Sequence, residues 1–552
     1  MFIYKKPPRS HALGEPLRHE NHARPRTRRE FIAAGMLSGP AMVVGPAWLG
    51  ALLKANRANA APPLDQDINA LLAAAECNIP ASGVGLPFIC FDLAGGANLV
   101  GSEVIVGQQS GNNVLNTQTN FLTTAGYGKL GVPGNMVPSS TTVNSSLGLL
   151  WHADGAIQRG ITSMITPATA AGVNGAVICA MSQNDTQTNP HNPMYGIAKA
   201  GRKGQLLQLI GTQSSVSGGN SQAPMELIVP ALQPSTITQP SDATSLVPIP
   251  PGGKQDPLSV AVMESQTRIS GGTGLYNNGS GPNYNQGQFT GALGMPTSLY
   301  GTAQQDALLK NQVRCAYVNA TNTANQFGDP SALDPTKDPN ILAIAAKFGA
   351  NAFMDSDFKK TATVMKLVLN GFTAAGTITM GGYDYHDGTR ATGETRNFKA
   401  GQMIGAVLAY ASTLPPPFPG LMIYVFSDGS LNSNSMVDNS AAGRGKLSWQ
   451  GDNSSVASTF FLVYSPKGRP ALRGAAGAQQ IGSFTADGSV VSTSSPAANS
   501  VDSLVQTVLL NYMGLSGTDA NFASLFQSWT GQSQGLGSAG QLAGLTVFQP
   551  IV

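Results

Sequence analysis

Two side chains with the chemistry of metal ligands stand two residues apart in a glycine-flanked turn. Asp384 and His386 lie in the segment 381–388, which reads Gly-Gly-Tyr-Asp-Tyr-His-Asp-Gly. A carboxylate and an imidazole at this spacing can reach one centre, and both groups bind divalent cations. A strand-end Asp-x-His between glycines has no evident packing role, so we interpret Asp384 and His386 as metal ligands.

Further acidic residues lie at the ends of other short apolar runs. Asp92 belongs to the first run, Asp428 follows a later one, and Asp452 precedes the run after that. In open α/β sheets, ligands bind beyond the carboxyl ends of the strands. Carboxylates that converge on one rim either bind a cation or repel one another. The sequence therefore predicts a site for a divalent metal built from Asp384, His386 and Asp428, with Asp452 and Asp92 as further ligands.

Histidine is scarce after residue 60, where His152, His191 and His386 are the only three. His191 lies in the constrained loop 189–193, which reads Asn-Pro-His-Asn-Pro. We take His191 as the candidate catalytic residue, either as a ligand or as a proton donor. A hydrogen-bonded structural histidine is the alternative for His191, and it is the interpretation that we favour for His152.

The elements that must position these residues are short apolar runs with turn-forming ends, which are typical of buried strands. Helical patterns and long polar stretches lie between them. Strands that alternate with helices of this length predict an α/β fold with a mostly parallel central sheet, flanked by helices on both faces. The predicted strands are 86–93, 175–181, 225–232, 377–380, 421–426 and 459–464, and the predicted helices are 303–324, 358–369 and 400–411. Long loops rich in Gly, Ser and Asn are predicted at 211–224, 233–254, 271–297 and 487–500, the first three forming a loop or cap insertion at about 211–300.

The first 60 residues have the order of an export signal: a basic region, an apolar region and small residues at 58–60. The pair Arg28-Arg29, with Phe31 two positions on, resembles the twin-arginine (Tat) class of bacterial signals. We expect residues 1–60 to be the signal peptide and the Tat translocase to be its partner. Residues 61–552 would then be one folded domain, delivered to the periplasm or secreted. An uncleaved membrane anchor over 31–53 is the alternative, although six Gly and Pro residues make that segment a poor membrane helix.

Removal of the signal changes the charge of the chain. Ten of the 32 Lys and Arg residues lie in residues 1–60, against three of the 29 Asp and Glu residues. The remainder carries 22 basic and 26 acidic side chains, so its net charge is near −4. Nucleic acid is an unsuitable partner for such a chain, because duplex binding needs a positive footprint. No later apolar run is long enough and free enough of charge to cross a membrane.

The four cysteines, Cys77, Cys90, Cys179 and Cys315, show no Cys-x-x-Cys or histidine-rich spacing. A zinc ribbon or a haem site is therefore not expected. Cys77 and Cys90 are close enough in sequence for a disulfide in an oxidising compartment. A buried thiol that packs as a small hydrophobic group is the alternative, notably for Cys179 in its apolar run.

Several of these segments together resemble a known family. Their order is that of an uncharacterised family of Tat-exported bacterial proteins grouped with the alkaline phosphatase and sulfatase superfamily, and the resemblance covers most of residues 85–470. It is specific at the central segment, which is similar to the family's Gly-Gly-Phe-Asp-Thr-His. The segments that carry it are 95–98 (Gly-Gly-Ala-Asn), 189–191 (Asn-Pro-His), 381–386, 426–429 (Phe-Ser-Asp-Gly) and 451–453 (Gly-Asp-Asn).

The resemblance implies an alkaline-phosphatase-like fold and metal-dependent hydrolysis of phosphate or sulfate esters. Three positions depart from the family pattern: Asn98 replaces an acidic residue, while Gly429 and Asn453 stand where histidines are usual. The remaining oxygen-rich set suits Ca²⁺, Mg²⁺ or Mn²⁺ better than a two-zinc centre. A non-catalytic envelope or secreted protein that keeps the fold for binding or assembly is the alternative.

Overall fold

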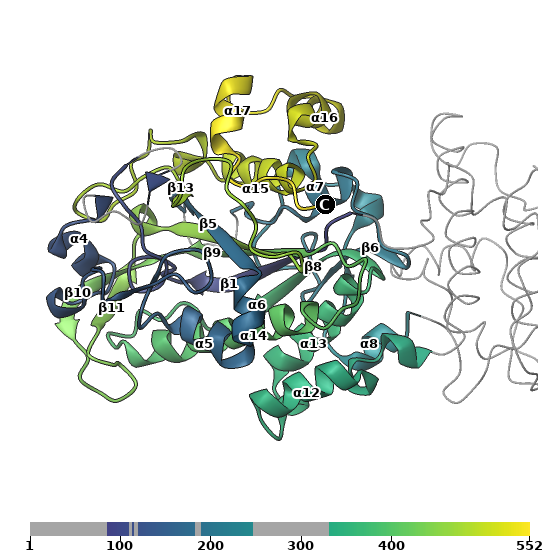
Figure 1. The fold of residues 1–552 in the computed structure, drawn as a ribbon, viewed down its shortest axis with the longest axis horizontal. Helices are drawn as coiled ribbons and strands as arrows, with labels where there is room; N and C mark the ends of the chain where they lie inside the picture. The colour runs from purple at the N-terminus through teal and green to yellow at the C-terminus, as the bar shows by residue number, and fades with distance from the viewer. Residues whose placement is uncertain (1–84, 110–112, 115–119, 183–188, 247–329) are drawn as a thin grey trace, which may run out of the picture.

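The computed structural model describes residues 85–109, 113–114, 120–182, 189–246 and 330–552 (Figure 1). These residues form a central sheet of nine strands in the order β2-β13-β5-β12-β9-β1-β8-β6-β7. The strands are β1 (Phe88–Gly96), β2 (Asn113–Val114), β5 (Val173–Cys179), β6 (Leu207–Gly211), β7 (Ser235–Thr236), β8 (Thr373–Met380), β9 (Leu421–Gly429), β12 (Ser458–Tyr464) and β13 (Ala478–Ile481).

The sheet is mostly parallel, with two reversed strands. Five neighbouring strands are parallel, in the order β9, β1, β8, β6 and β7, and β13 is parallel to β5. β12 runs antiparallel to both β5 and β9, and β2 runs antiparallel to β13. The predicted mostly parallel α/β sheet is thus confirmed, and the structure adds that the sheet is mixed.

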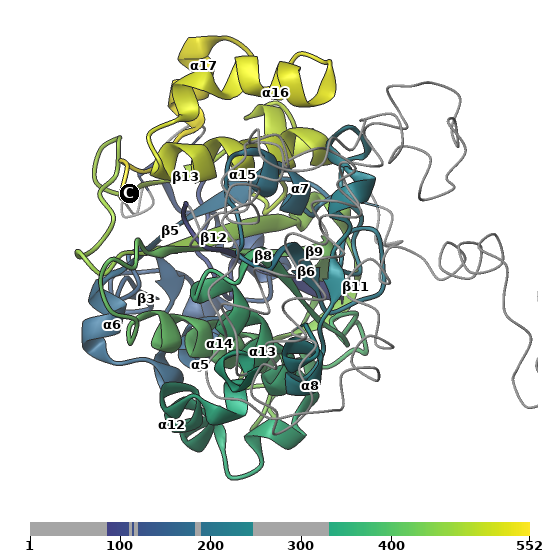
Figure 2. The same ribbon diagram turned by 90° about the vertical axis from the view of Figure 1, so that its right-hand side faces the viewer.

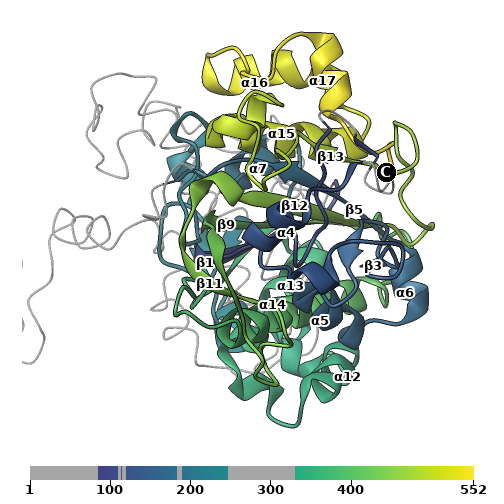
Figure 3. The same ribbon diagram turned by 90° about the vertical axis from the view of Figure 1, so that its left-hand side faces the viewer.

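Helices cover both faces of this sheet (Figures 1, 2 and 3). In β1, Phe88 and Cys90 belong to one hydrophobic core, whereas Ile89, Phe91 and Leu93 belong to the other. This alternation follows from the two-residue repeat of a strand, and a strand buried on both faces reads as a continuous apolar run. One face carries α5 (Ala156–Met164), α12 (Pro339–Phe348), α13 (Ser356–Leu369) and α14 (Ala391–Ala411), and the other carries α7 (Met194–Lys199), α15 (Val501–Leu515), α16 (Phe522–Thr530) and α17 (Ala539–Leu545).

Smaller elements complete the described part of the chain. The strands β10 (Leu431–Val437) and β11 (Leu447–Asp452) pair antiparallel as a hairpin, at the left of Figure 1. β3 (Val143–Asn144) and β4 (Trp151–His152) form a second short pair. The remaining α-helices of the described residues are α4 (Thr124–Lys129), α6 (Pro167–Ala171) and α8 (Pro240–Thr244). None of the described helices combines the length and the apolar character that a membrane crossing requires.

The helices α5 and α14 touch through their backbones at three glycines. A Cβ atom added to Gly160 would lie 2.2 Å from the carbonyl oxygen of Phe398, and one added to Gly401 would lie 2.1 Å from that of Ile157. At Gly405 the corresponding distance, to the carbonyl oxygen of Ile161, is 2.8 Å. Only residues without a side chain allow so close an approach.

Most predicted elements are present, with one clear error. Five of the six predicted strands and the helices at 358–369 and 400–411 are found, as β1, β5, β8, β9, β12, α13 and α14. The predicted strand 225–232 is wrong, because that segment forms two 3-10 turns, Met225–Leu227 and Pro230–Leu232. Pro230 begins the second turn and has no N–H to donate to a ladder, so the apolar run cannot continue as a strand.

Several predictions fall on parts of the chain that the structure does not describe. The predicted helix 303–324, the signal peptide 1–60 and most of the insertion at 211–300 lie outside the described residues. Within the insertion, the described part 233–246 contains the short helix α8 in addition to the expected loop.

Candidate metal centre

The sheet order brings the ends of three neighbouring strands to one edge. β1 lies between β9 and β8, and Asp92 of β1 is in register with Phe426 on one side and Thr379 on the other. The segments that follow these three parallel strands therefore leave the sheet at the same edge. Because β12 is antiparallel, its first residue, Ser458, lies at this edge too, with Asp452 a short distance before it in the chain.

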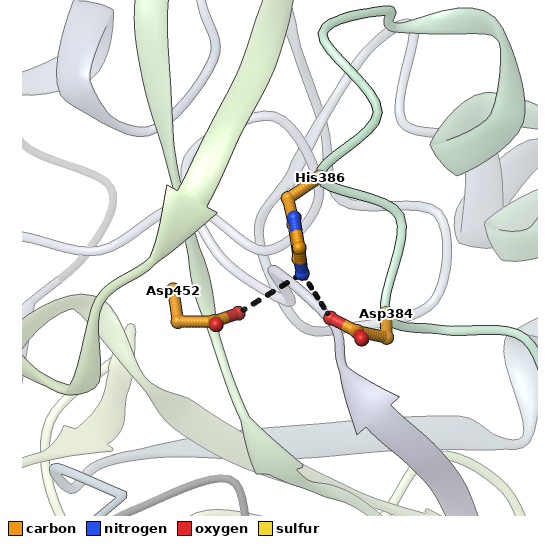
Figure 4. Close-up of side chains that lie close together, drawn as sticks. All are labelled: Asp384, His386 and Asp452. Carbon is orange, nitrogen blue, oxygen red and sulfur yellow. Dashed lines mark ion pairs between the residues drawn. The ribbon is translucent and has the colours of Figure 1, made fainter.

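Asp384, His386 and Asp452 form a compact group at this edge (Figure 4). One ligand atom from each lies within 4.8 Å of the others. His386 lies between the two carboxylates, with its Nε2 atom 2.9 Å from Asp384 Oδ1 and 3.9 Å from Asp452 Oδ1. The side chains of His386, Asp452 and Asp384 are 40%, 45% and 58% exposed, so an ion, water and a further ligand can reach them from solvent.

Two buried tyrosines hold the turn that carries Asp384 and His386. Tyr383 and Tyr385 are buried while the residues between and after them are exposed, so the chain alternates between core and solvent. The Tyr385 hydroxyl accepts a hydrogen bond from the backbone N–H of Asn98 and donates one to the side chain of Asn397. This anchoring of Tyr385 directs the two neighbouring side chains outward.

Gly95 packs directly beneath Asp384. Its φ angle of +112° falls in the region that favours glycine, and a Cβ atom there would lie 2.6 Å from the backbone nitrogen of Asp384. The glycine-rich segment after β1 therefore lets the turn after β8 approach its backbone. This packing role, which the sequence did not reveal, fixes the height of Asp384 above the sheet.

A buried ionic cluster ties the β10–β11 hairpin, and with it Asp452, to the same turn. Glu394 Oε1 accepts from Arg390 Nη2 at 2.9 Å and from Lys446 Nζ at 2.8 Å, and all three side chains are at most 3% exposed. Arg390 also stacks over Trp449, with its Cζ atom 4.4 Å from the ring centroid. The backbone N–H of Trp449 donates to the carbonyl of Thr389. Buried charges of this kind are costly unless paired, and here the pairing joins α14 to β11.

Asp428 does not join the exposed group, contrary to the prediction that it shares an ion with Asp384 and His386. Its side chain is fully buried, and its Oδ1 atom accepts a hydrogen bond from the backbone N–H of Gly95 at 3.1 Å. Asp428 lies two residues after Phe426 and therefore on the same face of β9, which is the face covered by α7 and α15. The sequence could not show which face of the sheet each residue of β9 is on. In the structure, the carboxylate of Asp428 is on the buried face and not at the exposed rim.

Asp92 is also fully buried and outside the exposed group. Its Oδ2 atom accepts hydrogen bonds from the backbone N–H groups of Asn220 and Ser221, at 2.6 Å and 2.9 Å. Burial raises the pKa of Asp92 to about 7, and the nearby charge of Asp428 adds to this, against the hydrogen bonds that lower it. Asp92 therefore attaches the loop at 219–221 to the sheet.

His191 is buried against an aromatic ring. Its imidazole stacks on Phe426 with the ring centroids 5.7 Å apart, and burial lowers its pKa to about 4. Neither ring nitrogen has a hydrogen-bond partner within the structure, and His191 does not belong to the group at Asp384. His152, by contrast, has the structural role that we favoured, because its Nε2 atom contacts the Met136 carbonyl and its Nδ1 atom accepts from Asp154 N–H.

Two of the three departures from the family pattern have structural roles here. Asn98 is buried, where its side chain donates to the Leu431 carbonyl and accepts from the Val100 N–H. Asn453 caps a 3-10 turn, and its Oδ1 atom accepts from the backbone N–H of Ser455. Both amides thus stabilise segments beside the exposed group.

The cysteines that the structure describes are free thiols. Cys90 and Cys179 are both buried, which confirms the hydrophobic role of Cys179. The Sγ atom of Cys90 lies 3.2 Å from Thr377 Oγ1, so the suggested disulfide to Cys77 is not formed. Cys77 itself lies outside the described residues.

The exposed group fits a divalent cation by its donor set. Two carboxylates and one imidazole are ligands of Ca²⁺, Mg²⁺ and Mn²⁺, and three protein ligands with open positions are also the pattern of catalytic Zn²⁺ sites. Comparisons with protein-family models, with curated proteins and with solved structures gave no match. The function must therefore be inferred from the site itself.

Proposed function

We propose that this protein is an exported, metal-dependent hydrolase of phosphate or sulfate esters, with an alkaline-phosphatase-like fold. The observation that carries the proposal is the exposed group of Asp384, His386 and Asp452, with ligand atoms within 4.8 Å of one another at the carboxyl edge of the sheet. The resemblance of segments 381–386 and 426–429 to the alkaline phosphatase and sulfatase superfamily supports the same reaction class.

Each residue of the group would contribute in a stated way. Asp384 and Asp452 would supply oxygen ligands, and His386 would supply Nε2 from between them. A bound divalent cation would polarise the ester oxygen and stabilise charge on the transferring group. Because the three side chains are about half exposed, they leave one side of the group open to the substrate and to water.

The test compares two substitutions in one turn. Asp384→Asn removes a ligand charge, and we expect it to weaken Mn²⁺ binding on the order of 100-fold and to abolish ester hydrolysis. Asp387→Asn makes the same charge change at a carboxylate that bonds Thr389 and Thr392 instead of joining the group, so both properties should be kept. Binding is measured by titration calorimetry and hydrolysis with aryl phosphates and aryl sulfates over a panel of Ca²⁺, Mg²⁺, Mn²⁺ and Zn²⁺.

A non-catalytic envelope or secreted protein for binding or assembly is the second candidate function. It is favoured by the burial of Asp92 and Asp428, which leaves one group of three ligands in the described part of the chain. Metal binding without hydrolysis of either ester class would support this second function. Absence of metal binding would reject the hydrolase.

Export is tested separately, at the paired arginines. Replacement of Arg28 and Arg29 by lysine should leave unprocessed precursor in the cytoplasm, because the Tat route depends on this pair. Normal processing of the variant would argue for the Sec route or for an uncleaved anchor.

A further inference from the structure

The guanidinium group of Arg396, in α14, packs against the turn that carries Asp384 and His386. A Cβ atom built on Gly382 would lie 2.8 Å from Arg396 Cζ and 2.9 Å from its Nη2. Gly382 also has a φ angle of +83°, in the region that favours glycine. The guanidinium thus occupies the space that a side chain at position 382 would fill.

Gly382 belongs to the exposed part of the turn that carries Asp384 and His386. Between positions 382 and 386, the residues Gly382, Asp384 and His386 are exposed, and Tyr383 and Tyr385 are buried. The guanidinium of Arg396 therefore packs against this exposed turn at a position two residues before Asp384.

The charge of Arg396 is not neutralised within the structure. The other two basic residues at the start of α14 are ion-paired, Arg390 with Glu394 and Lys399 with both Asp355 and Asp357. Arg396 has no ion pair and no side-chain hydrogen bond with any residue that the structure describes. A cation that is held in place by packing and has no anionic partner is suited to bind an anion from solution.

We infer that Arg396 binds the charged oxygens of the substrate and so sets its specificity for esters that carry an anionic phosphate or sulfate group. The inference rests on the proposed function, because the ester oxygen must at the same time reach the group of Asp384, His386 and Asp452. The planar guanidinium donates two parallel hydrogen bonds to such an oxyanion, a geometry that a neutral ester does not match.

The experiment uses the full chain and two probes, Mn²⁺ alone and inorganic phosphate added to the Mn²⁺-loaded protein. Arg396→Ala and Arg396→Gln should weaken phosphate binding about 10–100-fold, the range of a charge-assisted hydrogen bond, and Arg396→Lys should recover part of it. Mn²⁺ affinity should stay within about twofold of wild type, because Arg396 is not a ligand. In hydrolysis, the loss should appear in KM or in kcat/KM for the aryl phosphates and aryl sulfates.

A matched control removes one positive charge elsewhere. Lys467 is exposed near the end of β12, at the opposite edge of the sheet, and Lys467→Ala should leave phosphate binding unchanged. If Arg396→Ala and Arg396→Gln both bind Mn²⁺ and keep the wild-type affinity for phosphate, the inference about Arg396 is overturned. The proposed metal site is not affected by that result. Failure of wild type to bind Mn²⁺ would overturn the proposed function and this inference with it. Comparable thermal unfolding of all variants separates these results from loss of the fold.

Discussion

The two sets of acidic residues at this edge of the sheet differ in their environment, although the sequence makes them look alike. Asp384 and Asp452 are about half exposed and share His386, whereas Asp92 and Asp428 are fully buried and accept backbone hydrogen bonds. The exposed carboxylates lie in a turn and at a hairpin end, outside the sheet. The buried ones lie within β1 and β9, where strand alternation directs them into the core under α7 and α15. At this edge, the carboxylates that are available for chemistry are thus the ones outside the central sheet.

The largest expected effect on stability is at Asp428. Asp428→Ala removes the acceptor of the Gly95 N–H inside the core, and we expect a loss of about 3 kcal/mol in the free energy of unfolding. Asp384→Ala, at an exposed position, should cost less than about 0.5 kcal/mol. Urea unfolding of both variants measures the difference. Equal losses would show that the two sets do not differ in their contribution to the fold.

The next effect, which depends on pH, is expected at Asp92. Its folded-state pKa of about 7 lies above its ordinary value of 3.8, so the folded protein binds a proton there more tightly than the unfolded chain does. This contribution to stability is full below about pH 4 and is lost as the pH rises to about 7. Between pH 4 and pH 7 the loss should be about 3 kcal/mol for wild type relative to Asp92→Asn, which cannot ionise.

The measurement for Asp92 is urea unfolding of both proteins from pH 4 to pH 8. Burial also raises the pKa of Glu103 to about 7. Glu103 gives both proteins the same dependence on pH, so its contribution cancels when their stabilities are subtracted. A difference that stays constant across this range would mean that Asp92 titrates near its ordinary pKa and is solvated.

The smallest effect is expected at His191. Because both ring nitrogens are buried without a hydrogen-bond partner among the described residues, His191→Phe should change the free energy of unfolding by no more than about 1 kcal/mol. The stacking on Phe426 is preserved, and Mn²⁺ affinity and ester hydrolysis should remain at the wild-type level. A large loss of hydrolysis at unchanged stability would restore His191 as a catalytic residue.

The sequence predicted the sheet well because its strands are buried on both faces and read as apolar runs. It did not predict β6 or α15, since β6 is short and α15 is buried over nearly its whole length, which hides the helical period of its apolar residues. The prediction of a strand at 225–232 failed because the apolar run there is interrupted by Pro230.

The candidate site was predicted in part, for reasons that individual residues make clear. Asp384 and His386 are adjacent in one turn, so spacing alone places them together. Asp452 was given only a secondary role, because its position depends on the β10–β11 hairpin and on the buried pairing of Lys446 with Glu394. The burial of Asp428 and Asp92 depends on which side of the sheet the odd and even residues face, and a strand buried on both faces gives no sign of that.

The glycine contact between α5 and α14 determines which parts of the site can move. With the two backbones touching at Gly160 and Gly401, α14 has no side-chain layer across which to slide or rotate against α5. The helix that carries Arg396 therefore behaves as one rigid piece with α5. Because the buried pairing of Lys446 with Glu394 also ties the β10–β11 hairpin to α14, the metal ligands and Arg396 are held in one rigid frame before any ester binds.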